Sequence, residues 1–554
     1  MVRRERPSRV SAVKGLSCVL GRPVATVPRS AAMCQVQEED EQYSAAVQSR
    51  RPDISLEQKC MKCKESSAIL IIRVGDAFCK VCFKEYFVHK FRAMLGKNRL
   101  IYPGEKVLLA LSGGPASSSM LQQVQEGLSR EAPKKLRFVP GLVYVDEGAV
   151  RGQNLKEREK TITEMELILK RSGFPYHIVC LEEVFNLPSS VVQRVSKDIL
   201  EVTHDYKTAV DGFMCYQSQL ENAASGSRTC CTEAWVQAQL PELSTKEPAR
   251  QEPAAFTGML HLPPPHTTQA LNQLFSSLKS LTAKEELLQI LRSHLIVHTA
   301  RIQGYSKVML GDSCTRLAVK LLTNISLGRG AFLAMDTGFS DSRHGDVVVV
   351  RPMREYSLKE ISFYTKMFGV PTVFSPALNT KASDKGSIHQ LTENFINKLQ
   401  ADFPSTVSTV YRTSEKLNVG GLNKDSATFC LFCLCPLDTQ VGKASAFYAA
   451  LVSERLSQKS SPDPPGKERC ARSQEQSECC MKASASSSST LRSDFLNLLC
   501  YGCRVTAKEL TTLDYLPHYI HCEADRRARR AAMKEEVQEF LLHDDTDLNQ
   551  AMRI

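Results

Sequence analysis

The feature that constrains this chain most is a short stretch in which a buried strand runs into a glycine turn and a helix. Residues 107–111 are all apolar, which predicts a strand inside a sheet. Ser112, Gly113 and Gly114 then turn the chain, and Pro115 favours a helix start because its missing N–H has no partner there. Such a turn presents backbone N–H groups that can bind phosphate. An ordinary strand-to-helix turn without a ligand explains the same residues.

The surrounding pattern predicts the fold class. Short apolar runs indicate strands, and the amphipathic segments between them indicate helices. Strands are predicted at 107–111, 138–145, 176–181, 307–310 and 347–351, and helices at 156–170, 311–322, 358–368, 386–401 and 404–417. Alternation of this kind predicts an α/β domain with a doubly wound parallel sheet over residues 101–420. Asp146 follows the second strand, at the edge where such sheets bind ligands.

Cysteine spacing predicts a metal site on the N-terminal side of this domain. The pattern C-x2-C-x15-C-x2-C is typical of a zinc ribbon, with the two pairs on two turns and a β arm over 68–74 between them. Four thiolates would fill the tetrahedral shell of zinc, so we expect a structural site. Four free thiols at this spacing are the alternative. The predicted ligands are Cys60, Cys63, Cys79 and Cys82.

A second cysteine group is predicted toward the C-terminal end. Two further C-x-x-C pairs are separated by a Ser/Pro-rich tract, 457–490, that we expect to be disordered. A long loop adds little to the entropy cost of bringing the pairs together, because that cost grows only logarithmically with loop length. Cys435 would be a spare or alternate ligand. The predicted ligands of this second zinc site are Cys430, Cys433, Cys500 and Cys503.

Composition limits the class of protein. Twenty cysteines would suit disulfides in a secreted chain, but there is no clear signal peptide. Many cysteines also come as C-x-x-C pairs, which favours metal ligands in a reducing compartment. No apolar run approaches the roughly 18 residues needed to cross a bilayer, so we expect no membrane segment. The net charge of +11 favours a polyanionic partner without identifying it.

These observations divide the chain into five parts. Residues 1–55 are predicted to be a disordered head, basic and then acidic. Its start resembles a transit peptide in composition, or it precedes an alternative start at Met33. The other parts are a ribbon and helix at 56–100, the α/β domain at 101–420 with a flexible insertion at 216–268, a second ribbon at 425–505 interrupted by 457–490, and a helical tail at 506–554. The basic helix within this tail is expected to be solvated.

The helix after the first ribbon combines an apolar face and a basic face. Phe83, Phe87 and Phe91 recur at helical spacing and should face the core. Basic residues on the other face would contact the phosphates of a nucleic acid, or would simply be solvated. The candidate contacts are Lys90, Arg92, Lys97 and Arg99.

The glycine turn resembles the PP-loop of the N-type ATP pyrophosphatases, whose pattern is SGGxDS. Members of this family use ATP to activate an oxygen or a carboxyl group as an adenylate. The candidate nucleotide site consists of Ser112, Gly113, Gly114 and Ser117, which match the pattern, and Asp146. The Asp position of the pattern is Ala116 here, which removes an oxygen ligand for magnesium. The resemblance therefore implies the fold, whereas Ala116 leaves ATP binding doubtful.

The order of ribbon, helix, glycine turn, Val145–Gly148 and second ribbon resembles the tRNA 2-thiolation branch of this family. Segments 90–97 and 311–318 resemble its non-catalytic subunits, and the paired acids of catalytic members are Thr315 and Arg316 here. The resemblance implies a cytoplasmic heterodimer with a catalytic paralogue that adenylates the wobble uridine of Lys, Glu and Gln tRNAs. It also implies a thiocarboxylated ubiquitin-like carrier as the sulfur source, and no enzyme activity of this chain alone.

Two other functions fit the same residues. A self-sufficient adenylating tRNA thiolase would need Asp146 or Asp312 to replace the lost acids. A zinc-ribbon binding protein would act outside tRNA modification. Cys314 lies at an expected helix N-terminus, which would lower its pKa and allow it to relay sulfur. A buried structural cysteine is the alternative at this position.

Overall fold

The computed structural model describes the parts of the chain that carry the predicted domain and both cysteine groups. The described residues are 58–72, 76–129, 135–195, 262–380, 382–383, 385–417, 429–437, 453–454 and 492–538. The predicted head, the tract at 457–490 and residues 216–261 of the predicted insertion lie outside them. Among the described residues, no helix combines the length and the apolar character that a membrane crossing requires.

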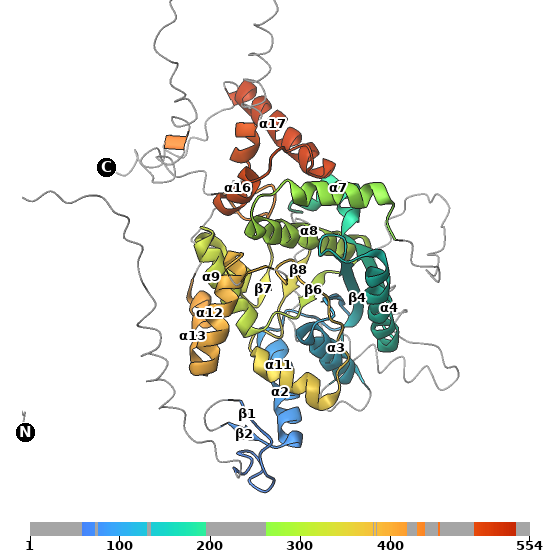
Figure 1. The fold of residues 1–554 in the computed structure, drawn as a ribbon, viewed down its shortest axis with the longest axis vertical. Coiled ribbons are helices and arrows are strands. Elements are labelled where there is room, and N and C mark those ends of the chain that lie inside the picture. Colours follow the sequence, from blue (N-terminus) through green and yellow to red (C-terminus); the bar gives the residue numbers. More distant parts are fainter. Residues whose placement is uncertain are drawn as a thin grey trace, which may run out of the picture. The chain divides into compact units, whose positions relative to one another are not determined.

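One six-stranded sheet organises the α/β domain (Figure 1). Its strands are β3 (Lys106–Leu111), β4 (Val139–Asp146), β5 (Tyr176–Cys180), β6 (Lys307–Leu310), β7 (Ser340–Asp341) and β8 (Val348–Val350). They lie in the order β5-β4-β3-β6-β8-β7, and all neighbours are parallel except β7 and β8. The strand order reverses at β3, which lies between β4 and β6. The prediction of a parallel α/β sheet is confirmed.

Helices cover both faces of the sheet, so the sheet is doubly wound. One face carries α2 (Lys80–Asn98), α3 (Pro115–Leu128), α4 (Leu155–Ser172) and α11 (Leu358–Phe368). The other face carries α7 (Pro265–Ser276), α8 (Leu281–Ile302), α16 (Tyr501–Lys508), α17 (His518–Gln538) and the 3-10 turns η1 (Leu181–Asn186) and η2 (Ser189–Val192). Strand β3 supplies Val107 and Leu109 to the first face and Leu108 to the second, as the two-residue period of a strand requires.

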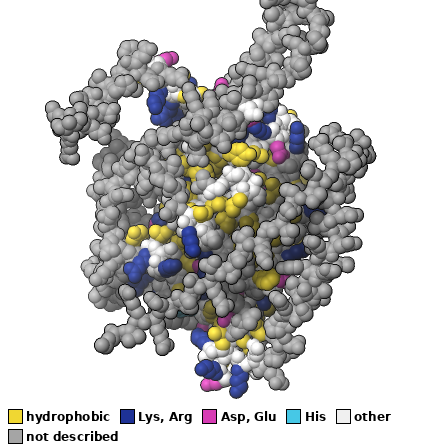
Figure 2. All heavy atoms as spheres, turned by 90° about the vertical axis from the view of Figure 1, so that its left-hand side faces the viewer, with side chains coloured by type: hydrophobic (Ala, Val, Ile, Leu, Met, Phe, Trp, Pro, Cys, Tyr) yellow, Lys and Arg dark blue, Asp and Glu magenta, His cyan; other side chains and the backbone are white. Residues whose placement is uncertain are grey.

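A third apolar cluster joins α9 (Cys314–Ser326), α12 (Ile388–Asp402) and α13 (Pro404–Thr413). The remaining short helical segments are α10 (Leu333–Thr337), η3 (Gly330–Phe332) and η4 (Ser414–Lys416). On the outward side of α12, Leu391 and Phe395 lie one turn apart and are 53% and 55% exposed. Figure 2 faces the side of the molecule that carries α9, α12 and α13, and it shows hydrophobic side chains at the surface.

Helix boundaries in the domain follow local signals. Helix α4 begins with a reciprocal capping box between Asn154 and Glu157 and ends at Gly173, whose φ of 72° is left-handed. Helix α11 uses the same devices, with Ser357 as its N-cap. The predicted insertion ends earlier than we expected, because Pro265 already begins α7. Proline suits this first helical position because its missing N–H costs nothing there.

Helix α17 is partly built into the core, which corrects the prediction of a solvated helix. Its side chains Tyr519, Ile520 and Ala524 are buried in the same cluster as α8. Helix α16 contacts α8 as well, so both C-terminal helices lie beside α8 (Figure 1). The buried face went unrecognised because it holds few apolar residues among many charges, and one of its buried members is Glu523. The side chains of residues 528–534, 536 and 537 are exposed as expected.

Candidate functional site

The glycine turn after β3 has the shape that the sequence predicts. Gly113 has a φ of 77°, and a Cβ at this position would lie 2.8 Å from Met165 Sδ. Its carbonyl accepts a hydrogen bond from the backbone N–H of Val373 (2.9 Å), and Pro115 then begins α3. Left-handed backbone and lack of space both require glycine here.

The serines of the turn are satisfied within the turn itself. The backbone N–H of Ser112 donates to Ser117 Oγ (3.2 Å), which in turn donates to the Gly114 carbonyl (3.1 Å). Gly311, directly after β6, packs on this turn so closely that a Cβ there would lie 2.9 Å from Ser117 N. The two motifs predicted from sequence therefore lie side by side at the carboxyl edge of the sheet.

Asp146, which we assigned to the nucleotide site, belongs to a buried charge network. Its side chain is 1% exposed and accepts hydrogen bonds from Arg158 Nε and from the backbone N–H of Gly148 (3.1 Å). Arg158 also donates two hydrogen bonds of 2.7 Å to Glu182. Burial raises the pKa of Asp146 in spite of Arg158. With its oxygens engaged in this way, Asp146 is not placed to ligate magnesium.

The other acids at this edge of the sheet are paired with arginines as well. Glu147 is buried and forms ion pairs with Arg151 and Arg292. Burial alone would raise the pKa of Glu147, but Arg292 and Arg151 outweigh it and lower the pKa. Asp312 lies 3.4 Å from Arg351. Each acid after β4 and β6 therefore has a guanidinium partner, which competes with any cation for the carboxylate.

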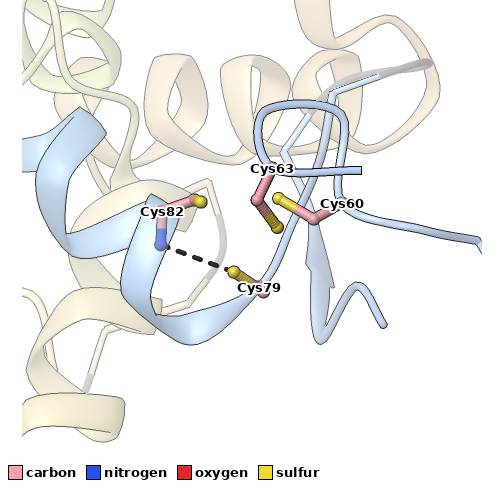
Figure 3. Close-up of side chains that lie close together, drawn as sticks. All are labelled: Cys60, Cys63, Cys79 and Cys82. Carbon is pink, nitrogen blue, oxygen red and sulfur yellow. Dashed lines mark hydrogen bonds between the residues drawn. The ribbon is translucent and has the colours of Figure 1, made fainter. Parts of the chain in front are cut away.

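The four N-terminal cysteines meet in one group (Figure 3). Their sulfur atoms all lie within 4.8 Å of one another, so the group could hold a metal ion. Sulfurs around one zinc ion would be about 3.8 Å apart, given Zn–S bonds of about 2.3 Å. Cys79 is the N-cap of α2, and its sulfur accepts a hydrogen bond from Cys82 N (3.5 Å).

Two details of this predicted ribbon are corrected. The second cysteine pair begins a helix and does not lie on a turn, and the β arm is reduced to β1 (Leu70–Ile71) and β2 (Ala77–Phe78). A helix start suits thiolates because its free N–H groups donate to them. On the first turn, burial raises the pKa of Cys60, but backbone hydrogen bonds from Cys63 and Cys79 outweigh this and lower it to about 6.

The four C-terminal cysteines form a second group of the same size. Cys430, Cys433, Cys500 and Cys503 also have sulfur atoms within 4.8 Å of one another. Cys430 and Cys503 are fully buried, and Cys500 is the N-cap of α16. The predicted spare thiol, Cys435, lies outside this group and accepts a hydrogen bond from Arg343 Nη1 (3.2 Å). The donor set is all sulfur, which suits a zinc ion or another thiophilic metal.

The basic residues predicted on α2 fall into two classes. Lys90 donates to Glu360 on α11 (2.7 Å) and lies 4.8 Å from the centre of the Tyr356 ring. Because its ammonium is engaged inside the protein, Lys90 is corrected from a surface residue to a link between α2 and α11. Arg92 is half-buried, whereas the remaining candidates, Lys97 and Arg99, are exposed.

Residues 314 and 315 are structural in this fold. Cys314 is buried, and burial raises its pKa to about 12, which corrects the expectation of a lowered pKa. Thr315, at the position of a catalytic acid, donates to Gln400 on α12 (3.0 Å) and accepts a hydrogen bond from Leu358 N (3.1 Å). It therefore joins three helices, and its hydroxyl is not available to a ligand.

Sequence reasoning missed the arginines that pair with these acids. For Arg158 a signal existed, because it shares the apolar stripe of α4 with Ile162 and Met165, and a charge on such a stripe needs a buried partner. Arg292 reaches Glu147 across 145 positions of the sequence, and Arg343 reaches the Cys435 sulfur across 92, so no local pattern indicates these two contacts.

Comparisons with known proteins agree with the motifs. The sequence model of cytoplasmic tRNA 2-thiolation protein 2 matches residues 387–505. The protein of this name from Xenopus tropicalis is 54% identical over 524 residues, which cover 92% of this chain and 99% of the relative. The chain belongs to the cytoplasmic tRNA 2-thiolation protein 2 family. The Homo sapiens member is 50% identical over 538 residues, covering 93% of this chain and 99% of that member.

Membership in the cytoplasmic tRNA 2-thiolation protein 2 family confirms the resemblance drawn from segments 90–97, 112–115 and 311–318. A solved structure, the U34-tRNA thiolase NcsA from Methanococcus maripaludis with its 4Fe-4S cluster, aligns with a TM-score of 0.40 and 15% identity. The alignment covers 68% of this chain and 91% of that one, and the likeness is too weak to add to the assignment.

Proposed function

We propose that this chain is the non-catalytic subunit of the cytoplasmic complex that thiolates the wobble uridine of Lys, Glu and Gln tRNAs. Its partner is a catalytic paralogue that adenylates the uridine and takes sulfur from a thiocarboxylated ubiquitin-like carrier. The names of the relatives support a role in tRNA 2-thiolation and a cytoplasmic location. This chain contributes structure and binding surface to the complex.

The observation that carries this proposal is the occupation of the acids at the sheet edge. Adenylation uses magnesium, which proteins usually hold through one or two carboxylates together with water and the phosphates of the substrate. Asp146, Glu147 and Asp312 are paired with Arg158, Arg292 and Arg351 respectively. Ala116 provides no oxygen to replace them. These pairings support a chain that keeps the α/β fold while the described acids at this edge of the sheet are engaged by arginines instead of a metal ion.

We also propose that both cysteine groups hold structural zinc and that tRNA contacts α2 through Arg92, Lys97 and Arg99. Four sulfur ligands leave no open position on zinc, so the metal supplies cross-links and no catalysis.

The exposed Leu391 and Phe395 on α12 suit a protein interface, because grouped apolar side chains at a surface mark contacts.

A reconstitution with each subunit omitted tests the proposed function. We expect the purified chain to release no pyrophosphate from ATP and tRNA, and the complex with its paralogue to form 2-thiouridine. Omission of this chain should abolish thiolation even though the paralogue retains its own ATP site. Robust pyrophosphate release by this chain alone would instead establish a self-sufficient enzyme.

Restoring the missing acid is a sharper test of the same proposal. We expect Ala116→Asp alone to give no pyrophosphate release, because the neighbouring acids stay paired with arginine. The matched control is the reverse substitution, Asp→Ala, at the corresponding loop position of the paralogue, which should stop thiolation by the complex. Normal wobble thiolation in cells depleted of this chain would place its function outside tRNA modification.

A further inference from the structure

The C-terminal cysteine group lies against an arginine of the α/β domain. Arg329, directly after α9, donates from Nη2 to the Cys503 sulfur (3.7 Å). Its guanidinium lies over Gly502, and a Cβ on that residue would overlap it. Gly328 approaches the Tyr501 ring in the same way, with a φ of 71° that favours glycine. The close contact between segment 328–329 and the second C-x-x-C pair therefore requires glycine at positions 328 and 502, where a Cβ would overlap the neighbouring side chain.

A second arginine holds the first C-x-x-C pair. Arg343, just after β7, donates from Nη1 to the Cys435 sulfur (3.2 Å) and to the Cys433 carbonyl (3.4 Å). The Cys435 carbonyl closes the turn by accepting a hydrogen bond from Cys430 N (2.7 Å). The fifth thiol is thus held beside the group by an interaction of its own.

Both guanidinium groups are fixed by acids. Arg329 pairs with Glu286, which also binds His389 (2.7 Å). Arg343 pairs with Asp341 (2.8 Å) and with Asp336. Because carboxylates hold both guanidinium groups from the side away from the cysteines, the two arginines are oriented toward the sulfurs before any metal binds.

The positive charges of the two arginines affect how tightly the C-terminal cysteine group would bind a metal ion. Four thiolates around one Zn²⁺ carry a net charge of about −2, which is costly in a buried site without compensation. Donors to the sulfurs and nearby positive charge reduce that cost, and losing such a partner typically lowers metal affinity about 10- to 100-fold. The N-terminal group has a nearby lysine, Lys62, which is half exposed and pairs with Glu85.

We propose that Arg329 and Arg343 are positioning residues of the C-terminal metal site. Arg329 stabilises the thiolate of Cys503, and Arg343 holds the 433–435 turn and keeps Cys435 outside the ligand set. The proposal rests on the proposed occupancy of this site by zinc. It predicts that loss of either arginine weakens the C-terminal site and leaves the N-terminal site intact.

The test measures zinc retention in the full-length chain. Native mass spectrometry counts bound zinc during titration with a chelator, and thiol alkylation followed by peptide mapping identifies which cysteines lose their metal. Arg329→Met and Arg343→Met should release the C-terminal zinc at about 10- to 100-fold lower chelator concentration, with the N-terminal zinc unaffected. Arg329→Lys should recover part of the loss, because it keeps the charge without the planar fork of donors.

Two further variants separate this role from general destabilisation. Arg301→Met removes another guanidinium, which pairs with Asp346 (2.9 Å) and touches no cysteine, and it should leave both zinc ions in place. Gly502→Ala keeps both arginines but displaces Arg329, so it should weaken the C-terminal site even if the methionine variants do not fold.

Three results would overturn the inference. Folded arginine variants with wild-type zinc release would remove the proposed role. Unchanged release in Gly502→Ala would do the same where the methionine variants do not fold. A wild-type chain that retains zinc only at the N-terminal cysteines would remove the metal itself, while the subunit assay would still decide the proposed function.

Discussion

At the scale of single residues, the carboxyl edge of the sheet is dominated by arginine–carboxylate pairs. Arg158 and Asp146 are almost fully buried, as is Glu147 in its pair with Arg292. Removing one member of such a pair leaves an uncompensated charge and typically costs about 3–5 kcal/mol. The two members of each pair therefore depend on one another, at an edge that in a catalytic relative would have to accommodate nucleotide and metal.

We predict that Gly113→Ala destabilises the fold although the change adds only one methyl group. The new Cβ would meet Met165 Sδ and would also sit on left-handed backbone, for a combined cost of about 2–4 kcal/mol. Urea unfolding measures the loss. Gly152→Ala is the matched control, because Gly152 has a φ of 72° but no atom within 4 Å of its Cβ position, and it should lose only about 1–2 kcal/mol. Equal losses would show that space at Gly113 does not matter.

We predict a pH-dependent contribution to stability from His344. Burial, reinforced by Arg343, lowers its pKa to about 3, against about 6.5 in the unfolded chain. Below a pH of about 6.5, His344 therefore binds a proton in the unfolded chain but not in the folded chain. The free energy of unfolding falls as the pH drops below about 6.5 and continues to fall toward about 3.

The measurement compares wild type with His344→Leu between pH 7.5 and 5.5. Over this interval the wild type should lose about 1 kcal/mol more than the variant, because leucine cannot take up the proton. Parallel pH profiles would contradict the assignment of a neutral buried imidazole.

The sequence predicted the two cysteine groups because ligand spacing is a local property, and each C-x-x-C pair needs only its own turn or helix start. It could not predict that Lys90 is held by Glu360, because that contact joins helices far apart in the chain. The same holds for Arg292, because its partner Glu147 lies 145 positions earlier in the sequence. Long-range charge pairing has no period that a reader of the sequence can detect.

At the scale of elements, prediction succeeded where hydrophobic periodicity was strong. The helix predicted at 358–368 has those bounds as α11, and the strand predicted at 107–111 is extended by one residue as β3. Prediction failed for α17, because Tyr519 and Ile520 are nearly its only large apolar core residues and the flanking arginines suggested solvent. Burial of these two side chains holds the start of α17 against the core in spite of the many charged residues on the helix.

We predict that Ile520→Ala destabilises the protein by about 2–5 kcal/mol, because the side chain is fully buried beside α8 and its loss leaves a cavity. Met533→Ala on the same helix should change stability by less than about 0.5 kcal/mol, since Met533 is 66% exposed. Both values come from denaturant unfolding. Similar small changes in the two variants would mean that α17 is only loosely attached.

At the scale of the whole molecule, neither cysteine group is an independent module. Cys60, Cys79 and Cys82 share one apolar cluster with β3 and α11, and Cys430, Cys500 and Cys503 share the other with β3 and α8. The ribbon pattern predicted which cysteines come together, but it gave no information on which apolar cluster each group would join.

We predict that both cysteine groups release zinc in the same transition in which the α/β domain unfolds. Raising free zinc to about 100 times the dissociation constant of one site should stabilise the protein by about 2.7 kcal/mol. That corresponds to a rise of about 4 °C in a single calorimetric transition, because the entropy of unfolding grows with the number of ordered residues. Zinc-buffered calorimetry of the full chain makes the measurement. A separate early transition for the ribbons, with an unmoved main transition, would refute the shared cores.

The placement of α17 has a consequence for how the protein is made. Arg527 near the middle of this helix donates a hydrogen bond to the carbonyl of Val192, and Gln193 donates to Glu523 (2.9 Å). Residues synthesised late therefore hold a turn that was synthesised much earlier. A nascent chain that has not yet emerged beyond Tyr519 presents α8 with an unfilled apolar face. Products that terminate before Tyr519 would therefore remain recognisable to chaperones and proteases, because this face of α8 stays uncovered.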